Sequence, residues 1–122
     1  MYKIAIIDDE HNILNSLDKF LSRKKTYMID TFDNPLNALD DVKRSKYDLI
    51  LLDISMPQMD GINFLKEVKE ASPSTKVVMI TANSTLDRAI ECNSFGAENY
   101  LTKPFISLRD VENKIAKLLG TR

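Results

Sequence analysis

The chain has 122 residues, enough for one domain that buries roughly two-thirds of the surface its unfolded form exposes. Hydrophobic residues make up 43% of it, which supplies a core and excludes a disordered or fibrous chain. The chain has 17 Lys and Arg and 18 Asp and Glu, which gives a net charge of -1. This balance gives no reason to expect direct nucleic-acid binding or membrane binding by this domain. We therefore interpret residues 1–122 as a single globular domain.

Cysteine content and hydropathy narrow the cellular setting. Cys92 is the only cysteine, so the sequence excludes an internal disulfide and a cysteine-based metal cluster. Three acidic residues, Asp8, Asp9 and Glu10, end the first apolar run too early for a signal peptide. No stretch approaches the ~20 apolar residues that a membrane span needs. These features predict a reducing, cytoplasmic environment.

Five short apolar runs alternate with five segments of helical spacing. The runs, interpreted as strands, cover residues 3–7, 27–32, 48–52, 76–80 and 98–101. The helical segments carry apolar stripes, in chain order, at Ile13, Leu14, Leu17, Phe20 and Leu21; at Leu36, Leu39 and Val42; at Phe64, Leu65 and Val68; at Leu86, Ala89, Ile90 and Phe95; and at Leu108, Val111, Ile115, Leu118 and Leu119. Gly96 and Gly120 stand where glycines end helices.

This alternation predicts parallel strands joined by right-handed helical crossovers. Interior strands of such a sheet are apolar throughout, as the first, third and fourth runs are. The second run carries Asp30 and Thr31, and the fifth carries Glu98 and Asn99, so both are expected at edges. The prediction is an α/β fold: a doubly wound, five-stranded parallel sheet in the order 2-1-3-4-5 with five helices, the order of flavodoxin-like folds.

Ligands of such a sheet bind beyond the carboxyl ends of its strands. Polar residues follow four of the five predicted strands: Asp8, Asp9, Asp53, Thr81, Thr102 and Lys103. We expect them to converge at one edge, although they are up to 95 positions apart in the sequence.

Each of these residues also has a plainer interpretation. Asp9 could equally be a helix N-cap, Asp60 before Gly61 favours that role, and Thr81 alone could cap the fourth helix. Lys103 alone would be a solvated surface lysine. Asp53 differs, because it ends the most apolar strand and no helix begins for several residues after it. Unrelated surface residues would scatter over both ends of the sheet, so the convergence favours a functional site.

Three clustered carboxylates repel one another and call for a cation. An all-oxygen site that handles phosphate favours a hard ion, Mg²⁺ or Mn²⁺. One divalent ion and Lys103 together offset the three negative charges of Asp8, Asp9 and Asp53. A carboxylate in such a setting can act as a nucleophile toward a phosphoryl group and form an aspartyl phosphate.

Four motifs now resemble the receiver domain of two-component response regulators, over essentially the whole chain. They are IIDDE at 6–10, LLDISMPQMDG at 51–61, MITAN at 79–83 and YLTKPF at 100–105. Singly each motif is weak, but together, in this order and spacing, they are highly specific.

The resemblance implies roles for the site residues. Asp53 is expected to be the phosphoacceptor and Lys103 its lysine partner, with Mg²⁺ (or Mn²⁺) held by Asp8, Asp9, Asp53 and the backbone carbonyl of Ser55. Thr81 is expected to be the switch hydroxyl and Tyr100 the aromatic side chain that moves with it.

Two further expectations come from the resemblance. Ser55 and Asn83 occupy positions that tune how long the phosphate survives, and both are small and neutral here. The Lys103–Pro104 bond is expected to be cis, because proline lowers the cost of that isomer.

The resemblance also implies the partners. A sensor histidine kinase or a phosphotransfer protein would supply the phosphoryl group. An effector or output domain would read the surface formed by the fourth helix, fifth strand and fifth helix. The domain is then a phosphorylation switch that assists its own phosphorylation and dephosphorylation, and not an enzyme.

Three alternatives remain open at this point. A phosphatase of the haloacid dehalogenase type needs a second Asp two positions after the nucleophile, where this chain has Ser55, and it usually carries a cap insertion for which 122 residues leave no room. A flavodoxin-like carrier of FMN needs a phosphate loop rich in Ser, Thr and Gly, where this chain has the acidic DDEHN, and the chain contains no Trp to stack on a flavin. A degenerate receiver that binds partners without phosphorylation is the third, and phosphorylation with acetyl phosphate separates it from an active one.

Overall fold

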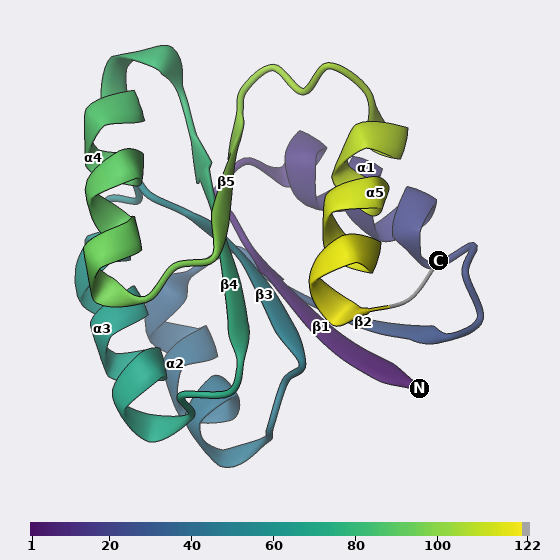
Figure 1. The fold of residues 1–122 in the computed structure, drawn as a ribbon, viewed down its shortest axis with the longest axis horizontal. Coiled ribbons are helices and arrows are strands. Elements are labelled where there is room, and N and C mark those ends of the chain that lie inside the picture. The colour runs from purple at the N-terminus through teal and green to yellow at the C-terminus, as the bar shows by residue number, and fades with distance from the viewer. Residues whose placement is uncertain (121–122) are drawn as a thin grey trace.

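A computed structural model of the chain describes residues 1–120, in which five strands alternate with five α-helices (Figure 1). The strands are β1 (Tyr2–Ile7), β2 (Tyr27–Phe32), β3 (Leu49–Asp53), β4 (Lys76–Thr81) and β5 (Asn99–Thr102). The α-helices are α1 (His11–Leu21), α2 (Pro35–Arg44), α3 (Gly61–Ala71), α4 (Leu86–Glu91) and α5 (Leu108–Leu119). Two short 3₁₀ helices, η1 (Asn83–Thr85) and η2 (Cys92–Phe95), flank α4.

All strand pairs are parallel, and the sheet order is β2-β1-β3-β4-β5. The predicted fold class and strand order are therefore confirmed, with β2 and β5 at the edges. Helices α1 and α5 cover one face of the sheet, and α2, α3 and α4 cover the other (Figure 1). The polar residues of the second and fifth runs stand on edge strands, where a side chain can reach water.

Each interior strand contributes to two cores, because successive side chains point to opposite faces. On β1, Ile4 and Ile6 pack with α1 and α5, whereas Ala5 and Ile7 pack with α2 and α3. All five residues of β3 are buried. The chain therefore needs an unbroken apolar run in each central strand, and the burial of Asp53 at the end of β3 is a consequence of that position.

The helix ends follow the expected chemistry. The Asp60 side chain accepts a hydrogen bond from the Ile62 amide at 2.9 Å and caps α3, as predicted. Gly96 and Gly120 have φ of 100° and 74°, so both take the left-handed conformation that favours glycine after a helix.

Two details of the predicted apolar stripes are wrong. Leu36 is 57% exposed and Ile90 is 48% exposed, although both were expected to face the core. In α2 the buried positions are Pro35, Ala38 and Val42, so Leu36 lies about 100° away around the helix from the first of them. The fourth helical segment is broken into η1, α4 and η2, and its buried positions are Ala89 and Cys92, which turns Ile90 outward.

Within residues 1–120, the helices are too short and too polar for any of them to traverse a bilayer.

Candidate functional site

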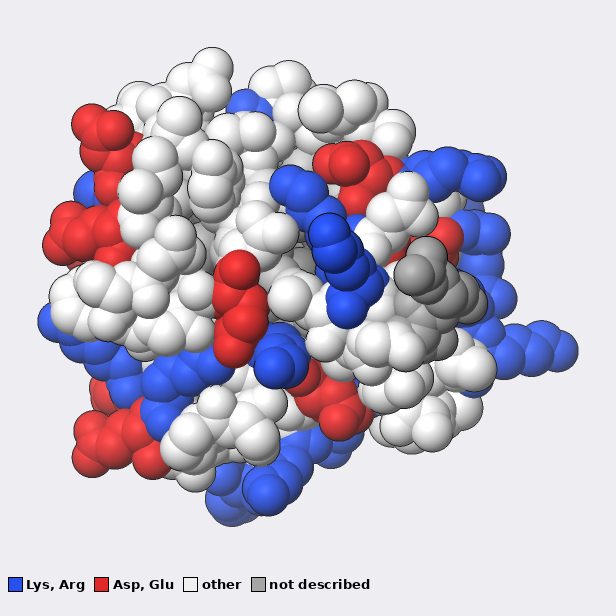
Figure 2. Space-filling model, in the orientation of Figure 1, with Lys and Arg blue, Asp and Glu red and all other residues white. Residues whose placement is uncertain are grey.

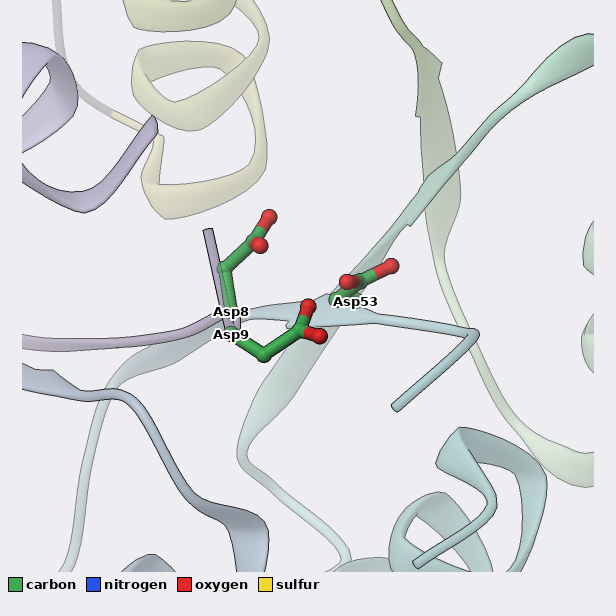
Figure 3. A group of neighbouring side chains, drawn as sticks. All are labelled: Asp8, Asp9 and Asp53. Carbon is green, nitrogen blue, oxygen red and sulfur yellow. The ribbon is translucent and has the colours of Figure 1, made fainter. Parts of the chain in front are cut away.

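The acidic residues of the predicted site meet at the carboxyl edge of the sheet. Asp8 directly follows β1, and Asp53 is the last residue of β3, where the register places it opposite Ile80 of β4. Figure 3 shows Asp8, Asp9 and Asp53 as neighbours that come from the ends of these two strands. One carboxylate oxygen from each of the three lies within 4.8 Å of the other two. Asp8 and Asp53 are 45 positions apart in the sequence, and the pairing of β1 with β3 brings them together.

Two of these carboxylates are removed from water. Asp8 is 0% exposed and Asp53 is 4% exposed, whereas Asp9 is exposed. Burial raises the pKa of Asp8. Burial, reinforced by the charge of Asp8, raises the pKa of Asp53 to about 7. Charge on these buried groups is therefore costly in the protein alone, and a cation in the site would relieve that cost.

Lys103 supplies one positive charge to this cluster. Its Nζ lies 3.0 Å from Asp8 Oδ2, 3.6 Å from Asp53 Oδ2 and 2.7 Å from Glu10 Oε1. Burial lowers the pKa of Lys103, but the hydrogen bond to Glu10 and the nearby carboxylates of Asp8 and Asp53 outweigh that effect and leave the pKa raised. The ammonium group therefore stays charged, and it is shared among three carboxylates.

The backbone positions Lys103 and the loop that follows it. The amide of Lys103 donates to the carbonyl oxygen of Thr81 at 2.7 Å, which ties the end of β5 to the end of β4. The Lys103–Pro104 peptide bond is cis.

The carboxylate oxygens of the acidic cluster accept few hydrogen bonds within the protein. Asp8 Oδ1 accepts from the Glu10 amide at 2.9 Å, and Asp53 Oδ1 accepts from the Ser55 amide at 3.3 Å. Among residues 1–120, Asp8 Oδ2 has no hydrogen-bond partner, since Lys103 Nζ approaches it without hydrogen-bond geometry. A buried, incompletely satisfied oxygen beside two further carboxylates is a donor set that suits a hard divalent cation. The residues present therefore fit a metal ion of this kind.

Thr81 is the polar residue contributed by β4. It is 1% exposed, and its hydroxyl lies 3.0 Å from the carbonyl oxygen of Ala82 and 2.5 Å from the hydroxyl of Thr85. Tyr100 lies on β5 and is half-buried against the core that α2, α3 and α4 cover. Ser55 and Asn83 are both exposed, Ser55 in the loop after β3 and Asn83 at the start of η1.

Sequence reasoning missed two members of this neighbourhood, Glu10 and Thr85. Glu10 completes the acidic run that begins at Asp8, and this run indicates that Glu10 lies near the site. The sequence does not indicate its pairing with Lys103, which is 93 positions away. No pattern in the sequence indicates the contact between Thr85 and Thr81, because it depends on the turn that η1 makes. Cys92 is fully buried in the core, and His11 is exposed and pairs with Asp33 at 2.9 Å.

Comparison with known proteins assigns the family. Residues 4–116 match the family model of the response regulator receiver domain. The chain is 35% identical over 117 residues to sporulation initiation phosphotransferase F of Bacillus subtilis, which covers 96% of this chain and 93% of that protein. The structure resembles the crystal structure of a CheY-like response regulator receiver domain protein from Methanospirillum hungatei, with a TM-score of 0.90, 28% identity, and coverage of 98% of this chain and 94% of that one.

The chain therefore belongs to the response regulator receiver domain family, the receiver domains of two-component systems. It is also 41% identical over 101 residues to the transcriptional regulatory protein ZraR of Klebsiella oxytoca. That match covers 83% of this chain but 23% of ZraR, so the chain spans about a quarter of the length of this relative.

Proposed function

We propose that the domain accepts a phosphoryl group on Asp53 from a histidine kinase or a phosphotransfer protein and then alters a surface that controls an effector. The observation that carries this proposal is the meeting of Asp53 with Asp8, Asp9 and Lys103 at the carboxyl edge of the sheet. The three carboxylates lie within 4.8 Å of one another, and Lys103 Nζ lies 3.6 Å from Asp53 Oδ2. This is an acceptor beside a cation-binding cluster and a fixed positive charge.

The transfer step is a displacement at phosphorus. A carboxylate oxygen of Asp53 forms the new P–O bond while the P–N bond to the donor's phosphohistidine breaks, and the electron pair of that bond stays on the imidazole nitrogen. The product is an acyl phosphate on Asp53. No co-reactant is needed, because the donor nitrogen carries away the bonding electrons.

The surrounding side chains bind and orient the group. Lys103 Nζ lies 3.6 Å from Asp53 Oδ2 and would pair with an oxygen of the arriving phosphoryl group. The hydroxyl of Thr81, at the end of the neighbouring strand, would donate to another once it leaves its bonds to Ala82 and Thr85. Mg²⁺ (or Mn²⁺), held by Asp8, Asp9, Asp53 and the Ser55 carbonyl, would neutralise the charge that gathers on the phosphoryl oxygens.

Loss of the phosphate belongs to the same site. Ser55 and Asn83 are small, neutral and exposed, so they leave the phosphoryl group open to water. We infer spontaneous hydrolysis assisted by the site and no turnover of a separate substrate, which makes the domain a switch.

The output surface is proposed to be the face formed by α4, β5 and α5. Thr81 precedes η1 and α4, and Tyr100 lies on β5. A shift of these two side chains would therefore change the conformation of this face. Figure 2 shows the face as uncharged areas interrupted by separate positive and negative side chains. Ile90 of α4 and Ile106 of the loop before α5 are 48% and 90% exposed. Exposed apolar side chains among mixed charges suit a protein partner.

The proposed partners follow from this assignment. A histidine kinase or phosphotransfer protein acts upstream, and an effector or an output domain such as those of longer regulators acts downstream. A cytoplasmic location agrees with such partners.

Intact-mass spectrometry after incubation with acetyl phosphate tests the proposal. We expect a gain of one phosphoryl mass that requires Mg²⁺ and is absent in Asp53→Asn. Asp33→Asn is the matched control, because Asp33 is an exposed carboxylate just after β2, outside the cluster. A mass gain that persists in Asp53→Asn would contradict the proposal, and no gain in the wild type would favour a receiver that works without phosphorylation.

A further inference from the structure

The side chain of Thr85 does not cap the helix that it precedes. Thr85 is the N-cap residue of α4, where a threonine hydroxyl ordinarily accepts a hydrogen bond from an amide of the first helical turn. Its side chain makes no such bond. The hydroxyl instead lies 2.5 Å from the hydroxyl of Thr81 and 3.2 Å from the carbonyl oxygen of Ala82. The side chain has thus turned from its own helix toward the end of β4.

The protons of the two hydroxyls are both used within this group. Each threonine hydroxyl carries one proton and accepts through its lone pairs. In one arrangement Thr81 donates to the Ala82 carbonyl and Thr85 donates to Thr81. In the other, Thr85 donates to the Ala82 carbonyl and Thr81 donates to Thr85. Either way, the proton of Thr81 is engaged on the side of η1.

Because Thr81 is buried, breaking one of the hydrogen bonds of its hydroxyl costs free energy. Thr81 is 1% exposed, so water has little access to replace a partner that its hydroxyl loses. To donate to a phosphoryl oxygen on Asp53, Thr81 must give up its bonds to η1. Thr85 can then fall back on the Ala82 carbonyl, which offsets part of that loss.

We propose that Thr85 is a positioning residue that holds the Thr81 hydroxyl in its resting orientation and opposes its recruitment by the phosphoryl group. This inference rests on the proposed function, since it assumes that Thr81 donates to a phosphoryl group on Asp53. Within residues 1–120 the Thr85 side chain hydrogen-bonds to Thr81 and Ala82 and to no member of the acidic cluster, so it would act through Thr81.

Beryllofluoride, which occupies a carboxylate as a phosphoryl mimic, provides the probe, and calorimetric titration with Mg²⁺ present gives its affinity. Removal of one hydrogen bond that favours the resting state should raise that affinity about 2- to 10-fold in Thr85→Val. Thr85→Ser keeps the hydroxyl and should behave as the wild type. Ser84→Ala, a neighbouring exposed residue of η1, is the control and should also leave the affinity unchanged.

A second pair of variants separates this role from a structural one. In a Thr81→Ala background the hydroxyl that Thr85 restrains is gone, so adding Thr85→Val should no longer change the affinity. An equal gain with and without Thr81 would overturn the proposal, as would an unchanged or weaker affinity in Thr85→Val. If Thr85→Val does not fold, Thr85→Ala removes the same hydroxyl and is judged by the same criteria.

The two proposals fail in distinguishable ways. A wild-type domain that binds no beryllofluoride and takes no phosphoryl group contradicts the proposed function itself. A wild-type domain that binds the mimic as tightly as Thr85→Val contradicts only the role of Thr85.

Discussion

The two ends of the sheet handle buried polar groups differently. At the amino end, Thr75 donates to the carbonyl oxygen of Tyr47 at 2.8 Å and accepts from the hydroxyl of Ser72 at 2.7 Å. Glu98 accepts from the Val77 amide at 2.7 Å and pairs with Lys69 at 2.9 Å. The phenol of Tyr27, at the start of β2, is an exception, since it has no partner within residues 1–120.

At the carboxyl end the charged groups are crowded and only partly paired. Asp8 Oδ2 has no hydrogen-bond partner among the described residues, the pKa of Asp53 is raised to about 7 by burial and by Asp8, and Lys103 is shared by three carboxylates. The amino end thus stabilises the fold, whereas the carboxyl end keeps buried charge that lowers stability, at the site that we propose takes up a cation and a phosphoryl group. Removing a buried polar group should therefore lower stability at the amino end and raise it at the carboxyl end.

The largest effect is expected at Gly61, where the loop after Asp53 closes on its own strand. A Cβ at this position would lie 2.6 Å from the backbone oxygen of Asp53 and 2.7 Å from the Cα of Ile54. Since both contacts are with backbone, Gly61→Ala should lower the free energy of unfolding by about 3 kcal/mol, as overpacking does. Urea denaturation measures this change, and a variant as stable as the wild type would show that the loop is free to move.

The second effect reverses the sign. Asp53→Asn removes a buried carboxylate whose pKa is raised to about 7, from a usual value of 3.8. A raised acid pKa means that the folded protein binds the proton more tightly, so the wild type loses stability as pH rises from about 4 through 7. Asp53→Asn escapes that loss and should be more stable than the wild type by about 2 kcal/mol at pH 8, with no advantage at pH 4.

Thermal unfolding at several pH values, without Mg²⁺, measures the difference for Asp53→Asn. Asp33→Asn again serves as the control, because Asp33 is exposed. A destabilised Asp53→Asn at pH 8 would mean that Asp53 supports the fold and would remove the contrast between the two ends.

A smaller loss is expected at the amino end. Thr75 is 2% exposed, and Thr75→Val would leave the carbonyl oxygen of Tyr47 and the hydroxyl of Ser72 without this partner. The cost should be about 1.5 kcal/mol. Urea denaturation at pH 5 and pH 8 should give the same loss, since no group in this network titrates between them, and a gain in stability would contradict the contrast.

The smallest effect concerns the ion pair between Arg88 of α4 and Asp60 at the start of α3. Both side chains are about 40% exposed, so Arg88→Ala should cost less than about 1 kcal/mol. The free-energy cost of Arg88→Ala should vanish in 1 M NaCl, because salt screens exposed charges. A cost that persists in high salt would indicate that Arg88 acts through packing.

Pattern alone predicted the fold well, because apolar runs of β1, β3 and β4 and polar residues in β2 and β5 follow directly from burial. The same topology let the sequence predict which residues meet at the carboxyl edge, since parallel strands end together. Their chemical roles remain predictions.

The misses have a common cause. The Glu10–Lys103 pair and the Thr81–Thr85 bond depend on side-chain rotamers and on the turn at η1, which periodicity does not encode. Leu36 and Ile90 were misplaced because a six- or ten-residue helix buries a narrow stripe, and hydrophobic composition does not fix its direction.

Chemical trapping of the phosphorylated residue tests the central claim most directly. Borohydride reduces an acyl phosphate to an alcohol, so treatment after acetyl phosphate and Mg²⁺ should convert the phosphorylated aspartate to homoserine. Peptide mapping of the trapped protein should find homoserine at position 53 and unmodified aspartate at positions 8 and 9. Homoserine at Asp8 or Asp9, or a phosphoryl mass that borohydride does not remove, would contradict the assignment of Asp53 as the acceptor.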